Sequence, residues 1–159
     1  MNKNIFIILF IISTGFLYSE NTLGLEENAD GTWNINYTSD EPIGYFTFML
    51  DDAYAESFVG GASIENSFFA PFQPPTEIIT FVGPPTPIPS ALEIPSGSGI
   101  LLILELNETP TLIQLSQIEI KNSTGEVIDD FIYKVDGCTE STACNYLSYA
   151  SHNDGSCTY

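Results

Sequence analysis

The sequence predicts an all-β fold in which two antiparallel sheets pack face to face, as in a sandwich or jelly roll of eight or nine strands. Short runs of apolar and β-branched residues are separated by Gly, Pro and Asn turns at the spacing usual for sandwiches. Lys and Arg, which are common on exposed helix faces, total only 3 of 159 residues. No amphipathic helix is expected beyond the first residues of the chain.

The first expected strand starts at Gly31 and alternates between two faces. Trp33, Ile35 and Tyr37 share one face, while Asn and Thr side chains occupy the other. Residues 44–50 (GYFTFML) follow after a turn, and their apolar side chains lie on both faces, as in the middle of a sandwich. We expect these two strands to form an antiparallel pair.

The middle of the chain contains loops and short strands. Residues 51–67 are rich in Gly, Ala, Ser and acids and predict a loop with an irregular strand near 54–59. Further strands are expected at 68–69 and at 77–82. Residues 83–89 (GPPTPIP) cannot donate a regular hydrogen-bond ladder, which predicts a loop or an edge crossing. A ligand for a proline-recognising domain is the less favoured alternative.

Three more strands are expected before the tail. Residues 100–106 (ILLILEL) are the strongest buried strand in the chain. Between 112 and 120 the apolar residues change from odd to even positions near Ser116, which predicts a β-bulge. A turn at 122–125 then leads into a last strand at 127–135.

The amino terminus has the pattern of an export signal. Lys3 precedes the uninterrupted apolar run Ile5–Ile12, and small residues lead to Ser19, where we expect cleavage. The chain then divides into a signal peptide (1–19), a β-sandwich (20–135) and a tail (136–159). All three cysteines lie in the last 22 residues, which agrees with export to an oxidising compartment. We expect a secreted or cell-surface protein.

The charge balance excludes one class of partner. The net charge is −18, with 21 acidic residues and no Arg. Nucleic acid is excluded because phosphate binding needs clustered cations. An anionic membrane surface is disfavoured for the same reason, so no membrane contact is expected after signal removal. A self-repelling acidic surface suits a saline medium or divalent cations.

The segments LGLEENADGTWNINYTSDEPIGYFTFML, PSGSGILLILEL and LSQIEIKNSTGEVID occur in this order. Together they resemble the cohesin-like domains of secreted bacterial proteins, over about residues 23–135. The tail at 137–159 reads GCTESTACNYLSYASHNDGSCTY. It resembles the Cys/Asp-rich repeat of the type GCTDPTACNY…DGSC that punctuates surface and secreted proteins of marine Bacteroidetes.

The resemblance of the tail implies a disulfide between Cys138 and Cys157, because such repeats often lack the middle cysteine. Cys144 would then be free, buried or bonded to another chain. Closing a loop of this size constrains the unfolded tail by about 3 kcal/mol in the chain-entropy model. The tail departs from the repeat at Glu140-Ser141, Ser148-Tyr149 and His152-Asn153, and these departures weaken any inherited metal site.

Calcium is the one ligand ion that the composition of the tail favours, and no other cofactor is expected. Hard oxygen donors, which calcium prefers, crowd the loop between the cysteines, and Gly155 permits a tight turn. The candidate ligands are Asp136, Glu140, Asn145, Asn153 and Asp154. No complete Asp-x-Asp-x-Asp-Gly loop is present, and a solvated polar turn is the favoured alternative.

Three sequons for N-glycosylation occur, at Asn36, Asn107 and Asn122. Asn36 lies on the polar face of a predicted strand, and the other two lie in predicted turns, so all three are sterically suitable. Such triplets also arise by chance, and Pro110 disfavours Asn107.

The inventory of reactive groups predicts that this protein is not an enzyme. His152 is the only histidine, and the chain has neither a G-x-S-x-G elbow nor a phosphate-binding Gly loop. Adjacent carboxylates such as Asp51-Asp52 and Asp129-Asp130 point to opposite faces of a strand, which does not suit a glycosidase pair.

The leading hypothesis for function is a self-associating subunit of an extracellular filament or surface layer. Residues 21–28 precede the first clear strand and could add to the sheet edge of a neighbouring copy. The residues expected to do so are Asn21, Thr22, Leu23, Gly24 and Leu25.

The alternative hypothesis is a cohesin-like adhesion module that binds another surface protein or a polysaccharide. Aromatic side chains exposed together would form a sugar platform, although core packing is expected for at least half of them. The candidates are Tyr54, Phe58, Phe68 and Phe69. A fragment of a longer adhesin is a third hypothesis.

Overall fold

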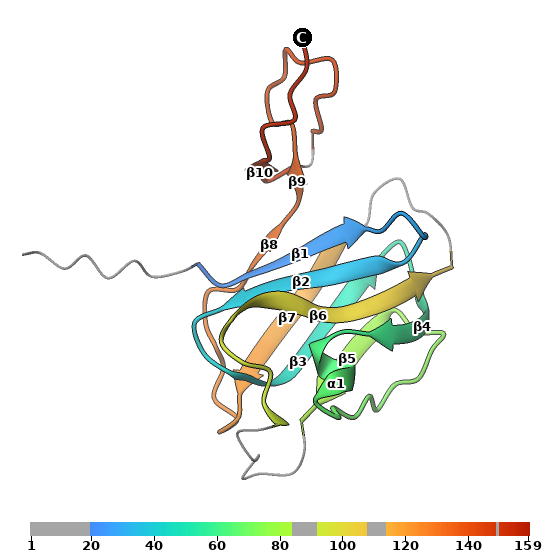
Figure 1. The fold of residues 1–159 in the computed structure, drawn as a ribbon, viewed down its shortest axis with the longest axis vertical. Coiled ribbons are helices and arrows are strands. Elements are labelled where there is room, and N and C mark those ends of the chain that lie inside the picture. The colour runs from blue at the N-terminus through green and yellow to red at the C-terminus, as the bar shows by residue number, and fades with distance from the viewer. Residues whose placement is uncertain (1–19, 84–91, 108–113, 149) are drawn as a thin grey trace, which may run out of the picture.

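Two β-sheets face each other in the computed structural model, which describes residues 20–83, 92–107, 114–148 and 150–159 (Figure 1). The predicted all-β, two-sheet architecture is confirmed. The larger sheet contains, in spatial order, β4 (Ala55–Gly60), β6 (Gly97–Leu106), β2 (Trp33–Ser39), β1 (Thr22–Glu27) and β8 (Ile132–Lys134). The smaller sheet contains β5 (Ile78–Val82), β3 (Ile43–Asp51) and β7 (Gln114–Asn122).

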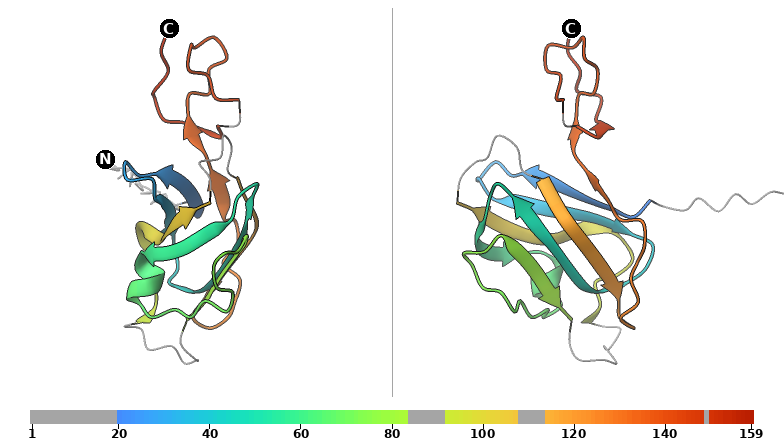
Figure 2. Two further views of the ribbon diagram at one scale, coloured as in Figure 1. Left: turned by 90° about the vertical axis from the view of Figure 1, so that its right-hand side faces the viewer. Right: turned by 180° about the vertical axis from the view of Figure 1, so that it is seen from behind.

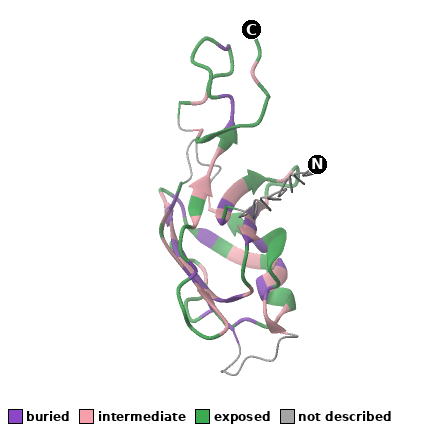
Figure 3. Ribbon diagram, turned by 90° about the vertical axis from the view of Figure 1, so that its left-hand side faces the viewer, coloured by how far each residue is buried: buried purple, intermediate pink, exposed green. Residues whose placement is uncertain are grey.

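The core lies between the two sheets and follows from the two-residue period of the strands. Along β3, Phe46, Phe48 and Leu50 are buried, while the side chains between them are only partly covered. Phe46 stacks against Phe81 of β5 at a ring-centroid distance of 5.2 Å. Figure 3 shows this alternation of buried and more exposed positions along the strands. Burying each large apolar side chain contributes roughly 1.5–3 kcal/mol.

The pairing predicted for the first two strands is wrong. β2 pairs with β1 and β6, whereas β3 pairs with β5 and β7 in the opposite sheet. The turn between them takes the chain across the sandwich, and two hydrogen bonds fix it. The amide of Asp40 donates to Oδ1 of Asn21 at 2.9 Å, and the hydroxyl of Ser39 donates to the carbonyl of Glu41 at 2.7 Å. The apolar faces of β2 and β3 therefore belong to opposite sheets that share one core.

The predicted β-bulge in the penultimate long strand is confirmed. The register of β7 against β3 changes from Thr47 opposite Glu119 to Met49 opposite Ser116, so β7 carries one extra residue. Gln117 in the bulge has φ of 51°. The bulge places both Leu115 and Ile120 in the core, although one is odd-numbered and the other even-numbered.

Three local expectations differ from the structure. The loop after β4 contains a one-turn helix, α1 (Ala62–Glu65), which is too short to show a helical period in the sequence. The expected strand at 68–69 is a single bridge between Phe69 and Val82. The expected strand at 127–135 is also split: Val127 bridges to Lys121, and β8 pairs in parallel with β1 of the larger sheet.

The tail leaves the sandwich directly after β8 and projects from one end of it (Figures 1 and 2). It contains β9 (Asp136–Gly137) and β10 (His152–Asn153), which pair in parallel. The carbonyl of Val135 accepts hydrogen bonds from the amides of Ser151 and His152, at 2.9 and 3.1 Å. These bonds connect the root of the tail to its last third.

The predicted signal peptide (1–19) and the proline-rich residues 84–89 lie outside the described residues. Within the described part of the chain, no helix has the length and apolar character needed to span a bilayer.

Gly61 is a position where the fold needs glycine. It precedes α1 with φ of 96° and ψ of 172°, and a Cβ there would lie 2.7 Å from the Cα of Leu102. We expect Gly61→Ala to lower the free energy of unfolding by about 3 kcal/mol, because it adds both strain and a backbone clash.

Gly31→Ala is the matched control, because Gly31 also has positive φ but nothing lies within 4 Å of a Cβ placed on it. It should cost about 1 kcal/mol, from strain alone. Urea unfolding followed by tryptophan fluorescence measures both variants, and equal losses would contradict the close approach of Gly61 to β6.

Candidate functional site

The disulfide of the tail is the one implied by the resemblance. Cys138 and Cys157 are bonded with an S–S distance of 2.03 Å, and Cys144 is free and exposed. The amide of Cys144 donates to the carbonyl of Thr158 at 2.8 Å, so this residue lies in a turn whose backbone is bonded to the last residues of the chain. The predicted bridge is confirmed, and an intermolecular bond of Cys144 stays a prediction.

Three of the side chains predicted to bind calcium form hydrogen bonds to the backbone of the tail itself. The amide group of Asn145 donates to the carbonyl of Ser156 at 2.8 Å, and its oxygen accepts from the amide of Thr158 at 2.8 Å. Asn153 accepts from the amide of Gly155, and Asp154 from the amide of Ser156.

The remaining two candidate ligands also have partners within the tail. Nδ1 of His152 lies 2.6 Å from Oδ1 of Asp136, and Glu140 accepts a hydrogen bond from the hydroxyl of Tyr159. The described residues contain no group of three or more His, Cys, Asp or Glu side chains that could hold a metal ion. Calcium binding therefore stays a prediction, without a formed site among these residues.

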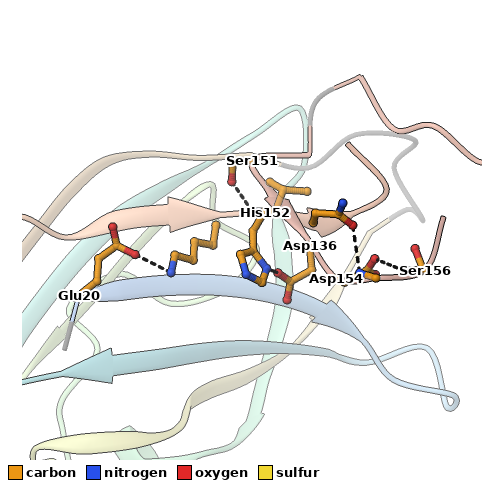
Figure 4. Close-up of polar contacts among 10 residues, drawn as sticks. Glu20, Asp136, Ser151, His152, Asp154 and Ser156 are labelled. Atoms are coloured by element: carbon orange, nitrogen blue, oxygen red, sulfur yellow. Dashed lines mark hydrogen bonds and ion pairs between the residues drawn. The ribbon is translucent and has the colours of Figure 1, made fainter. Parts of the chain in front are cut away.

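A polar cleft of about 560 Å³ separates the tail from the outer face of β1 and β2. Figure 4 shows the pair of Asp136 and His152 on this cleft. Lys134, which also lines the cleft, forms an ion pair with Glu20 at 2.6 Å. Hydrogen bonds from Ser156 hold the pKa of Asp154, on the same cleft, below its usual range.

The imidazole of His152 has a carboxylate partner at the cleft. Among the described residues, its Nδ1 lies 2.6 Å from Oδ1 of Asp136, and no hydroxyl or thiol is hydrogen-bonded to the ring. The acidic residues near this histidine also have partners in the chain: Asp136 pairs with His152 itself, and Asp154 accepts from the amide of Ser156.

The segment predicted to donate a strand to a neighbour is already paired within its own protomer. Thr22–Glu27 forms β1, which pairs with β2 on one side and with β8 on the other. Asn21 is buried; its side chain donates to the carbonyl of Asp129 at 3.2 Å, and its carbonyl accepts from the amide of Ile132 at 2.9 Å. Within one protomer the backbone groups of this segment complete the larger sheet, and its addition to a neighbouring copy stays a prediction.

The three sequon asparagines all take part in local hydrogen bonds. Asn36 donates to Glu26 at 2.9 Å, and Asn122 donates to Glu41 at 2.9 Å. The side-chain oxygen of Asn107 accepts from the amide of Tyr54 at 3.0 Å. All three are partly exposed, and their glycosylation stays a prediction.

The candidate site is the outer face of the three-stranded sheet, which Figure 2 (right) views from the front. In the register of the sheet, Tyr45 lies opposite Val82 and Met49 lies opposite Ile78. Phe69 extends the first row because it bridges to Val82. We call these five side chains the apolar face. Val82, Ile78 and Phe69 are 38%, 40% and 66% exposed.

A row of polar residues divides the apolar face. The hydroxyls of Thr47 and Thr80 lie 2.8 Å apart between the two apolar rows. Lys121 of β7 lies 4.9 Å above the ring of Tyr45 and pairs with Glu119 at 2.6 Å. The hydrogen bond and charge of Glu119 raise the pKa of Lys121, so the ammonium stays charged beside the aromatic ring. The result is a surface with two apolar rows, a pair of threonine hydroxyls between them and a charged border.

Sequence reasoning missed this face. The apolar side chains on both sides of residues 44–50 predicted a strand buried on both faces, but only the side with Phe46 and Phe48 is buried. The same two-sided pattern is also what an exposed binding face would produce. Of the four predicted platform aromatics, Phe68 is buried and Phe58 packs edge-to-face on Phe81, whereas Tyr54 and Phe69 are exposed.

No family model and no curated protein matches the chain. Among solved structures, one match is a chain of the crystal structure of a complex between a variant of CaDoc0917 and CaCohA2 at pH 5.5. The two chains are 16% identical with a TM-score of 0.43, and the match covers 70% of this chain and 93% of that chain. No feature of the matched chain is used to describe the sheets, the core or the apolar face of this chain.

The disulfide supplies much of the stability of the tail, because only Cys138 and Ala143 of its described apolar side chains are buried. We expect the double variant Cys138→Ser/Cys157→Ser to lose about 3 kcal/mol of protection in the tail by the chain-entropy relation. Hydrogen exchange read by mass spectrometry should show fast exchange at 136–159 and unchanged exchange in β3. Cys144→Ser is the control and should leave both regions unchanged; slow tail exchange in the double variant would contradict this account.

Because the pKa of Asp154 is lowered, the stability of the tail depends on pH in the acid range. The folded state favours the ionised carboxylate, so its contribution is present above the unfolded pKa and is lost as the pH falls through the lower folded pKa. We expect the amide resonance of Ser156 to shift as the pH falls below the ordinary Asp value of 3.8. NMR titration measures it, and a Ser156 resonance that does not respond to pH, or that responds equally in Asp154→Asn, would refute the assignment.

Proposed function

We propose that this chain is an extracellular protein-binding module whose binding surface is the apolar face of the three-stranded sheet. The exposure of Val82, Ile78 and Phe69 together on one face of the sheet carries the proposal. Single exposed apolar residues are normal on a protein surface, but apolar side chains gathered on one sheet face with a polar border are typical of an interaction site.

The proposed partner is a protein with an apolar centre and a basic rim. The net charge of −18 gives the whole surface an acidic field, which attracts and orients a basic partner. Lys121, the cation of the face, is already paired with Glu119. Secretion is part of the proposal and is supported by the export-signal pattern and by the disulfide in the tail.

A homotypic contact, as in a filament or surface layer, is the second candidate. The same apolar face would form the contact between two copies, since β1 is already paired on both sides within its own chain. Two copies that each carry −18 repel one another at low salt, so such a contact would need screening. The charge therefore favours a different, basic partner over a second copy.

Val82→Ser tests the binding surface. Val82 and Ile100 are each 38% exposed, but they lie on opposite sheets, so Ile100→Ser is the matched control. Partners captured from native culture medium by the immobilised wild-type chain are identified, purified and titrated by calorimetry. We expect Val82→Ser to weaken binding about tenfold, the effect of about 1.4 kcal/mol of lost contact, and Ile100→Ser to bind as the wild type does.

Equal binding by Val82→Ser and the wild type would refute the proposed surface. Sedimentation of the purified chain at low and high salt separates the two candidates. A monomer at both salts supports a different partner. If the chain assembles at high salt and Val82→Ser abolishes this assembly, the proposed partner would instead be a second copy of this chain.

A further inference from the structure

A second surface feature lies at the edge of the sandwich, where the start of β4 meets the segment before β5. It is an open groove of about 420 Å³, lined by Tyr54, Pro75, Thr76, Glu77 and Ile78. The two walls are fixed to each other by backbone hydrogen bonds. The amide of Ala55 donates to the carbonyl of Thr76 at 2.8 Å, and the amide of Thr76 donates to the carbonyl of Ala55 at 3.1 Å.

Tyr54 is held firmly in this groove by its backbone alone. Its amide donates to Oδ1 of Asn107 at 3.0 Å, and the amide of Asn107 donates to the carbonyl of Tyr54 at 3.2 Å. The side chain is 37% exposed, and within the described part of the chain its hydroxyl has no hydrogen-bond partner and its ring no aromatic partner. The ring is therefore a pre-positioned aromatic surface that the fold does not use.

The opposite wall carries Glu77, which lines the same groove as Tyr54. The hydroxyl of Thr76 donates to the carbonyl of Ile78 at 3.0 Å and accepts from its amide at 3.1 Å, which fixes the backbone on both sides of Glu77. The carbonyl of Glu77 also accepts from the amide of Leu50 at 2.9 Å. The carboxylate of Glu77 has no partner among the described residues, so it is available as an acceptor at the groove.

An aromatic ring in the same groove as an unpaired carboxylate suits a sugar. The C–H face of a pyranose packs on the ring, and its hydroxyls donate to the carboxylate. Grooves that bind proline-rich peptides are lined by several aromatic side chains, whereas Tyr54 is the one aromatic residue among the described residues that line this groove. The net charge of −18 and Glu77 itself repel acidic polysaccharides. We infer that this groove binds a neutral polysaccharide, with Tyr54 as the stacking surface and Glu77 as the hydrogen-bond acceptor.

Affinity gel electrophoresis of the full chain tests the inference, with gels that contain laminarin, xyloglucan, mannan or dextran, and alginate as the acidic polysaccharide. We expect retardation in at least one neutral gel and none in alginate. Tyr54→Ala should weaken the affinity at least tenfold, and Glu77→Gln several-fold. Tyr54→Phe keeps the ring and should retain binding.

Tyr146→Ala is the matched control, because Tyr146 is an exposed tyrosine outside both the groove and the apolar face, at 43% exposure. It should bind the glycan as the wild type does, and thermal melting by circular dichroism verifies that every variant is folded. No retardation in any neutral gel, undiminished binding by Tyr54→Ala, or binding to alginate alone would overturn the inference. A proline-rich peptide that binds through Tyr54 while no glycan does would overturn the ligand class.

The groove and the apolar face share Ile78, but the variants that test them change other side chains. Val82→Ser leaves the groove intact, and Tyr54→Ala leaves Tyr45, Phe69 and Val82 intact. Failure of glycan binding therefore does not count against the protein-binding surface. Failure of protein binding likewise does not count against the groove.

Discussion

Burial of apolar side chains between the two sheets is the interaction on which the rest of the structure depends. Phe46 lies at its centre and stacks with Phe48, Phe68 and Phe81. Because side chains alternate along a strand, burial of Phe46 and Phe48 requires that Tyr45 and Met49 point outward. The apolar face is thus the other side of the same strands that form the core. A change of register by one residue would exchange the two sets.

Charge contributes little to the stability of this fold and much to the electrostatic field around it. The two Lys ion pairs are substantially exposed, and exposed pairs typically contribute less than 1 kcal/mol. The remaining carboxylates lie mostly on the surface, where they generate a strong acidic field. Such a field attracts basic molecules and repels acidic ones, including a second copy at low salt. Any ligand of the proposed apolar face or of the groove at Tyr54 would meet this field.

The tail is stabilised in a different way from the sandwich. It buries almost no apolar surface, and its order depends on the disulfide, on the backbone bonds of Val135 and on polar side chains that cap its turns. Asn145, Asn153 and Asp154 looked like cation ligands because their oxygens are hard donors at close spacing. The same oxygens accept backbone amides, which is the common use of Asn and Asp in turns.

The sequence by itself determined the class of the fold, the bulge near Ser116 and, through its resemblance, the bridge of Cys138 to Cys157, because period, phase and motif are properties of the chain. It could not determine which strands share a sheet. β2 and β3 are neighbours in sequence but belong to opposite sheets, since their connection crosses the sandwich. For the same reason, the tertiary structure alone decided that Asn21 and β1 are internal and that Val82 and Tyr54 face solvent. Long-range pairing and burial make those decisions, and no local pattern encodes them.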